Sequence, residues 1–183
     1  MSILPFSLPG LWRQTAAPPA SAASHRLGYP LDPAPRTAVL GWPLMAEAQV
    51  AVLEDWTVKQ LEAARPEALA ASIRDLVEVA ALREMRVLKL RSLSYPLVVI
   101  TRACEARLSE ADHDRLWRLF RLPVFEQIRD SGGRLVAWEC ESRNGFHFAP
   151  GVAAHMGGPW DWPEQCGCES EAADELVEAP QVR

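Results

Sequence analysis

The sequence contains no long hydrophobic stretch. Within its 183 residues, no run approaches the roughly 18 consecutive apolar residues of a membrane-spanning helix. The first ten residues carry no basic cluster and are interrupted by Pro5 and Pro9, so we expect no secretory signal. The sequence therefore predicts a cytoplasmic protein without a membrane partner.

Cysteine and positive charge are also scarce. Four cysteines fall far below the density of a secreted domain that depends on disulfides, which favours reduced thiols. The 19 basic residues are outnumbered by 24 acidic ones, for a formal net charge of −5. The basic residues form no stripe of the kind that neutralises a row of phosphates, so we expect no nucleic-acid partner.

What the chain does contain is a group of potential metal ligands towards its C-terminal end: Cys140, His147, Cys166 and Cys168. Three thiols and one imidazole form the ligand set of a closed structural zinc site, which leaves no open position for catalytic water. The one-residue gap between the last two cysteines is tighter than the usual spacing of about two to four residues. Gly167 fills that gap, and glycine can adopt the positive φ that turns both thiols towards one point. We therefore predict structural zinc as the cofactor.

Two other interpretations of these residues stay open. In the first, Cys140 is a small core residue at the end of a strand, His147 lies on the surface, and the last two cysteines belong to an exposed redox-active or idle tail. In the second, a disulfide forms. Iron could also occupy the same ligands, although an isolated tetrahedral site of this kind favours zinc.

The chain divides into three predicted segments. Residues 1–44 hold eight of the 15 prolines, which predicts an irregular proline-rich arm. Residues 45–168 are predicted to form an α/β domain with the metal site, and residues 169–183 an acidic, solvated tail. The apolar residues of the arm indicate that it docks on its own domain or on another subunit, so we expect a protein partner. The seven tryptophans include Trp138, Trp160 and Trp162 around the metal ligands, where they either bury the site or form a core or partner-facing patch.

The fold class predicted for the domain is α/β, a small mixed sheet with packed helices and a zinc-stabilised C-terminal hairpin region. Residues 45–85 are predicted as two amphipathic helices, the second beginning at Pro66. Further elements follow from apolar runs and turn residues. They are strands at 87–90 and 97–101, a helix capped by Ser109 and Asp112, strands at 124–128 and 135–140 around a turn at 130–133, and a short strand through His147.

Several short runs in this half also carry a family resemblance. They are Leu108-Ser109-Glu110 through Leu116-Trp117, Leu122-Pro123-Val124-Phe125-Glu126, Glu139-Cys140-Glu141 and Gly145-Phe146-His147. In this order they resemble the phenylacetate-CoA ligase branch of adenylate-forming enzymes, over roughly residues 97–170. The ATP-binding motifs of that branch are missing: the chain has no phosphate-holding loop rich in Ser, Thr and Gly, and residues 127–133 replace a Tyr-Gly-x-Thr-Glu motif. The resemblance thus implies a metal-stabilised piece of a ligase-like fold that lacks self-sufficient adenylation.

These observations predict a non-catalytic zinc-binding protein that serves as an accessory or assembly subunit. One alternative is a subunit that completes an acyl-activating, CoA ligase-like enzyme. Another is an uncharacterised metal-dependent enzyme, for which Cys104, His113 and Glu126 are among the nucleophile, base and carboxylate candidates. A metal with four protein ligands argues for a structural role, and a metal-bound water argues for catalysis.

Overall fold

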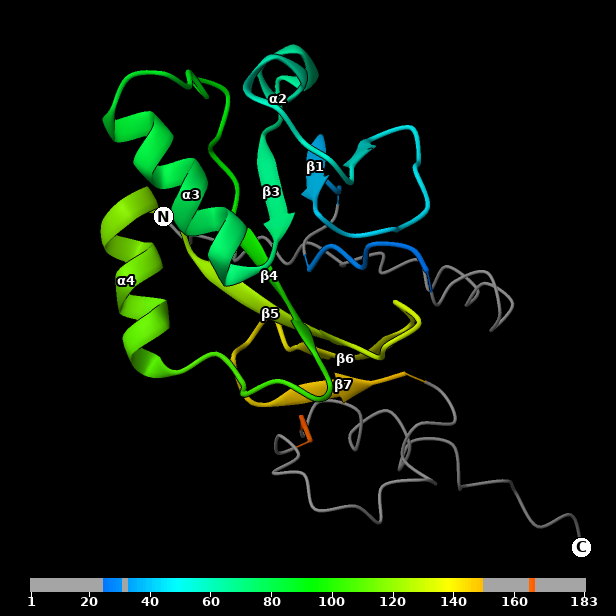
Figure 1. Cartoon of the computed structure of the whole chain (residues 1–183). Coiled ribbons are helices and arrows are strands. Elements are labelled where there is room, and N and C mark those ends of the chain that lie inside the picture. Colours follow the sequence, from blue (N-terminus) through cyan, green and yellow to red (C-terminus); the bar gives the residue numbers. More distant parts are fainter. Residues whose placement is uncertain (1–24, 31–32, 150–164, 167–183) are drawn as a thin grey trace, which may run out of the picture.

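A seven-stranded mixed sheet organises the chain (Figure 1). The computed structural model describes residues 25–30, 33–149 and 165–166. The strand order is β2-β1-β3-β4-β5-β6-β7; β1 to β5 run parallel, and β6 and β7 are antiparallel additions at one edge. The strands are β1 Thr37–Leu40, β2 Val50–Leu53, β3 Ala68–Ala71, β4 Leu97–Arg102, β5 Val124–Arg129, β6 Leu135–Glu139 and β7 Phe146–Phe148. The predicted α/β class with a mixed sheet and packed helices is confirmed.

The described part of the chain contains three helices, which pack on one face of the sheet (Figure 1). They are α2 Val58–Ala64, α3 Ile73–Glu84 and α4 Glu110–Phe120. Each begins after a hydroxyl side chain that accepts a hydrogen bond from the first turn: Thr57, Ser72 and Ser109. Ser109 and Asp112 form the predicted reciprocal capping box. Among the described residues, no helix has the length and apolar character needed to cross a membrane.

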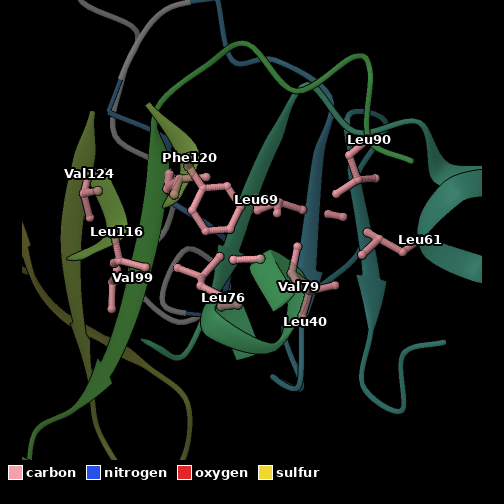
Figure 2. Close-up of a cluster of buried hydrophobic side chains, with 14 of the residues drawn as sticks. Leu40, Leu61, Leu69, Leu76, Val79, Leu90, Val99, Leu116, Phe120 and Val124 are labelled. Atoms are coloured by element: carbon pink, nitrogen blue, oxygen red, sulfur yellow. The ribbon is translucent and has the colours of Figure 1, made fainter. Parts of the chain in front are cut away.

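Alternate residues of the central strands face opposite sides of the sheet, and both sides are buried. In β3, Leu69 and Ala71 face the helices, whereas Ala70 faces the other side. The cluster under the helices is shown in Figure 2, where side chains of α2, α3 and α4 meet those of the strands. The opposite cluster consists of Leu27, Val39, Trp42, Leu44, Val50, Ala70, Val98 and Ile100. Burial on both faces explains why these strands are uninterrupted apolar runs rather than alternating ones.

Two polar side chains of β5 attach the segment that precedes β1 to the sheet. Gln127 Nε2 donates a hydrogen bond to the Gly28 carbonyl. Arg129 is fully buried and donates to the Arg26 carbonyl at 2.6 Å and to the Gly133 carbonyl at 2.8 Å. Burial lowers the pKa of the Arg129 guanidinium to about 10, which still leaves it charged at neutral pH. This buried cation therefore joins two distant parts of the chain.

The prediction for residues 45–85 is wrong in its first elements. Residues 50–53 form β2 rather than a helical turn, and α2 begins only at Val58. The second helix does not begin at Pro66 but after the Ser72 cap, because Ala68–Ala71 forms β3. Short apolar runs such as these do not distinguish a buried strand from a buried helix. From Ile73 onward the predicted helix is confirmed.

Two further expectations need correction. Residues 87–90 form no strand, and the Val87 N–H instead bonds back to the Leu82 carbonyl at 3.0 Å. Strand β1 lies within the range expected to be an irregular arm, yet it pairs with β2 and β3 inside the sheet. The wider division into arm, domain and tail stays a prediction, because residues 1–24 and 169–183 lie outside the described residues. The strands and helix predicted after residue 96 are confirmed within a residue or two.

We predict that Arg129→Met lowers the free energy of unfolding by about 2–4 kcal/mol, because it leaves two carbonyls without their charged donor. Arg134→Met is the matched control, since Arg134 pairs with Asp130 at 2.7 Å but its side chain is 66% exposed. The control should change stability by no more than about 0.5 kcal/mol in urea unfolding. Equal effects of the two substitutions would contradict this role of Arg129.

Candidate metal centre

The hairpin of β6 and β7 places Cys140 and His147 on the same side of the sheet. Cys140 directly follows β6, and its N–H donates to the Gly145 carbonyl at 2.9 Å. His147 is the middle residue of β7 and pairs with Trp138. Residues two apart on a strand share a face, and so do directly paired residues on neighbouring strands. Trp138, Cys140 and His147 therefore lie on one face.

A tight turn between the two strands sets this pairing. The Arg143 N–H donates to the Cys140 carbonyl at 2.8 Å, which closes the first half of the turn. Arg143 and Gly145 both have positive φ, 57° and 113°. Glycine adopts such a conformation without steric cost, so Gly145 can reverse the chain immediately before β7. The turn thus returns His147 to the level of Trp138.

Cys166 reaches the site from a distant part of the chain. Gln165 forms an isolated parallel bridge with Phe146, and the Cys166 N–H donates to the Phe146 carbonyl at 2.9 Å. This short segment, coloured orange, lies beside β7 (Figure 1). Cys140 and Cys166 are each only 3% exposed, whereas His147 is half-buried. Backbone hydrogen bonds therefore position Cys140, His147 and Cys166.

The ligating atoms of Cys140, His147 and Cys166 lie within 4.8 Å of one another. In a tetrahedral zinc site, bonds of about 2.3 Å to sulfur and about 2.0 Å to nitrogen separate the ligand atoms by roughly 3.5–3.8 Å. A shift of about 1 Å, within the range of a side-chain rotation, would bring the present group to that geometry. The three residues can hold a metal ion. The fourth predicted ligand, Cys168, lies outside the described residues, so the full set of four stays a prediction.

An aromatic ring supports the imidazole. Trp138 stacks on His147 with ring centroids 5.4 Å apart and an interplanar angle of 25°. Contacts around a ligand of this kind orient it and limit the access of solvent to the metal. Trp138 thus contacts the candidate site, as expected from the sequence interpretation in which the tryptophans bury it. Trp160 and Trp162 lie outside the described residues.

The redox state of Cys166 decides whether it can act as a ligand. The structure records this sulfur in a disulfide. A thiolate, and not a disulfide sulfur, is the metal ligand, so metal binding requires Cys166 in its reduced form. The metal-bound and disulfide states are therefore alternatives for the same residue.

The carboxylate of Glu126 is engaged elsewhere in the fold. It accepts hydrogen bonds from the Thr101 hydroxyl at 2.8 Å and from the Leu108 N–H at 3.1 Å, and Arg107 lies 3.5 Å away. The Glu126 N–H in turn donates to the side chain of Glu139 at 3.0 Å. The contacts of Arg107 and Leu108 attach the loop before α4 to β5. The group of three metal ligands contains neither carboxylate.

One residue of this region was not predicted from the sequence. The guanidinium of Arg107 lies 4.3 Å from the centre of the Phe146 ring, besides its contact with Glu126. It therefore connects the loop before α4 to the strand that carries His147. No motif marks Arg107, because its partners come from two distant strands. The catalytic candidates Cys104 and His113 are also described and do not belong to the metal group.

Comparisons with known proteins find similarity among solved structures. No protein-family model matches the chain, and no curated protein matches it. Among solved structures, the chain is similar to an open conformation of 2-hydroxyisobutyryl-CoA ligase in complex with 2-HIB-AMP and CoA. The identity is 10% and the TM-score 0.44, and the match covers 61% of this chain but only 29% of the ligase. This neighbour is an acyl-CoA ligase of the adenylate-forming family, and a likeness this weak carries no argument about function.

We predict that a bound metal protects the buried thiols from alkylation. In the reduced, metal-loaded protein, iodoacetamide should modify the exposed Cys104 first, with Cys140 and Cys166 shielded by burial and coordination. Adding a chelator should speed modification of the two shielded residues by at least ~10-fold and leave Cys104 unchanged, because the thiolates lose the metal. Peptide mass spectrometry measures each rate. Rates that do not respond to the chelator would contradict metal binding.

Proposed function

We propose that this protein is a non-catalytic zinc-binding accessory or assembly subunit, in which zinc attaches the C-terminal part of the chain to the edge of the sheet. The observation that carries the proposal is the convergence of Cys140, His147 and Cys166 within 4.8 Å. These residues are 26 positions apart at their extremes, so the fold brings them together.

The donor atoms favour zinc over the common alternatives. Two sulfurs and one imidazole nitrogen suit a borderline-soft cation, whereas calcium and magnesium select oxygen ligands. Cys168 is the proposed fourth ligand and would complete a tetrahedral set. A complete protein ligand set leaves no position for a reactive water, which is why we assign zinc a structural role.

The packing of this part of the sheet also supports a structural metal. Among the described residues, the hydrophobic cluster around β5, β6 and β7 contains four buried residues, against fifteen in the cluster under the helices. A cluster of this size stabilises a terminal hairpin only weakly, and small structural units commonly rely on a metal instead. A structural zinc site contributes a binding free energy on the order of 10 kcal/mol. Zinc would therefore add to the stability that the four described core residues give this edge.

Two observations support the accessory role over catalysis. The Glu126 carboxylate joins the loop before α4 to β5, and the Glu139 carboxylate accepts from the Glu126 N–H on the neighbouring strand, as expected of structural residues. The described surface also exposes large apolar side chains, among them Met85, Val87 and Trp117, which can contribute to a contact with another protein. In the alternative, the protein completes a ligase-like enzyme, and that enzyme would be the partner.

We predict that the reduced protein, purified without chelator, contains about one zinc per chain by inductively coupled plasma mass spectrometry. Cys140→Ser and His147→Ala should lose the metal and lower Tm by about 10 °C or more, because the binding energy of the metal is folding energy.

Cys104→Ser is the matched control for these variants, since it removes an exposed thiol outside the metal group. It should keep both the zinc and the Tm of the original chain. Absence of metal from the reduced protein, or an equal loss in the control, would disprove the structural zinc site.

A second prediction separates a structural site from a catalytic one. With cobalt(II) in place of zinc, the thiolate charge-transfer absorption should fall by about one third in Cys168→Ser, because two thiolates remain of three. In the original chain, the cobalt d–d bands should be those of a tetrahedral metal without bound water. An unchanged charge-transfer band in Cys168→Ser would remove this residue from the ligand set and favour an open, catalytic position.

A further inference from the structure

A second candidate site lies away from the hairpin of β6 and β7, at the amino-terminal ends of β1 and β3. It is a cavity of about 290 Å³. In the sheet, β4 and β5 separate β3 from the hairpin that carries the metal ligands. The cavity is lined by Arg36, Glu62, Arg65, Lys89, Leu90, Arg91 and Ser92.

The charge of this lining is opposite to that of the whole chain. Four of its seven residues are basic and one is acidic, although the chain carries a formal net charge of −5. Like charges gathered around one cavity repel one another, and an anion bound among them relieves that repulsion. The pattern therefore points to a negatively charged ligand.

The nearby carboxylates are already engaged with other groups. Glu62 accepts a hydrogen bond from the Lys89 N–H at 2.8 Å. Glu67 accepts from both the N–H and the guanidinium of Arg36, each at 3.1 Å, and these bonds lower the pKa of Glu67. In the part of the chain that the structure describes, the side chains of Arg65, Lys89 and Arg91 take part in no ion pair. Three cations therefore remain available to a ligand.

Local structure explains how these cations reach the cavity. Leu88 and Leu90 are buried while Lys89 and Arg91 are exposed, so the alternation along this segment keeps both charged side chains on the solvent side. Arg65 caps α2 with a left-handed backbone, φ 46° and ψ 54°. A cation at a helix C-terminus also complements the helix dipole, which accounts for part of its placement.

We propose that this cavity binds the phosphate group of a small phosphorylated molecule. Arginine presents a planar fork of donors that matches phosphate oxygens, and lysine adds a compact positive charge. A volume of about 290 Å³ is near the lower end of small-molecule sites, which suits a diphosphate or a phosphorylated metabolite. The proposal is independent of the zinc site, since no residue is shared between them.

The test is a titration of the ¹⁵N-labelled full chain with inorganic pyrophosphate at constant ionic strength, followed by amide chemical shifts. Saturable shifts should appear at Arg65, Lys89 and Arg91 below about 10 mM ligand, and not around Cys140. The double variant Lys89→Gln/Arg91→Gln should bind at least ~10-fold more weakly, because it loses two of the charged contacts. Arg65→Gln provides a second, independent variant.

The matched control is Arg115→Gln/Arg118→Gln, which removes the same charge from the exposed side of α4. It should bind pyrophosphate within about twofold of the original chain, since only general electrostatics change. Zinc content measured before and after the titration excludes chelation by pyrophosphate as the source of the shifts. Absence of saturable shifts, or equal weakening in both double variants, would overturn the phosphate site.

Discussion

Burial of the central strands on both faces is the constraint on which the rest of this structure depends. Each of β1, β3 and β4 sends alternate side chains under the helices and to the opposite face, and nearly all of them are fully buried. One face is covered by three amphipathic helices, and the other is partly covered by the segment before β1 that Gln127 and Arg129 hold in place. Because a shift of one residue would move each set of side chains to the opposite face, the register of these central strands is fixed.

Strand register also positions the candidate metal ligands on β6 and β7. Side chains alternate along a strand, so a slip of one residue between β6 and β7 would move His147 to the face opposite Cys140. The pairing of Trp138 with His147 and the bridge between Gln165 and Phe146 hold the ligands in register from both sides. The candidate metal centre is thus a consequence of strand pairing at the sheet edge, and a bound metal would in turn strengthen that pairing.

The sequence predicted the second half of the fold better than the first, for a physical reason. Ser109 and Asp112 form a local capping box, and the turn at Asp130 is closed by hydrogen bonds within five residues, so both signals are readable from neighbouring positions. Strands β1, β2 and β3 are four-residue apolar runs whose pairing partners are distant in the chain. Runs of this kind fit a helix equally well until the sheet that buries them is known.

The sequence by itself determined the donor types of the candidate metal centre, because the thiols and the imidazole are chemical properties of Cys140, His147 and Cys166. It also determined the α/β class through the periodicity of its apolar residues. Only the tertiary structure decided that these three ligands meet within 4.8 Å and that Arg129 joins the segment before β1 to β5. It likewise gathered four cations around one cavity. Each of these arrangements depends on contacts between residues far apart in the chain, and such contacts arise only when the whole sheet is assembled.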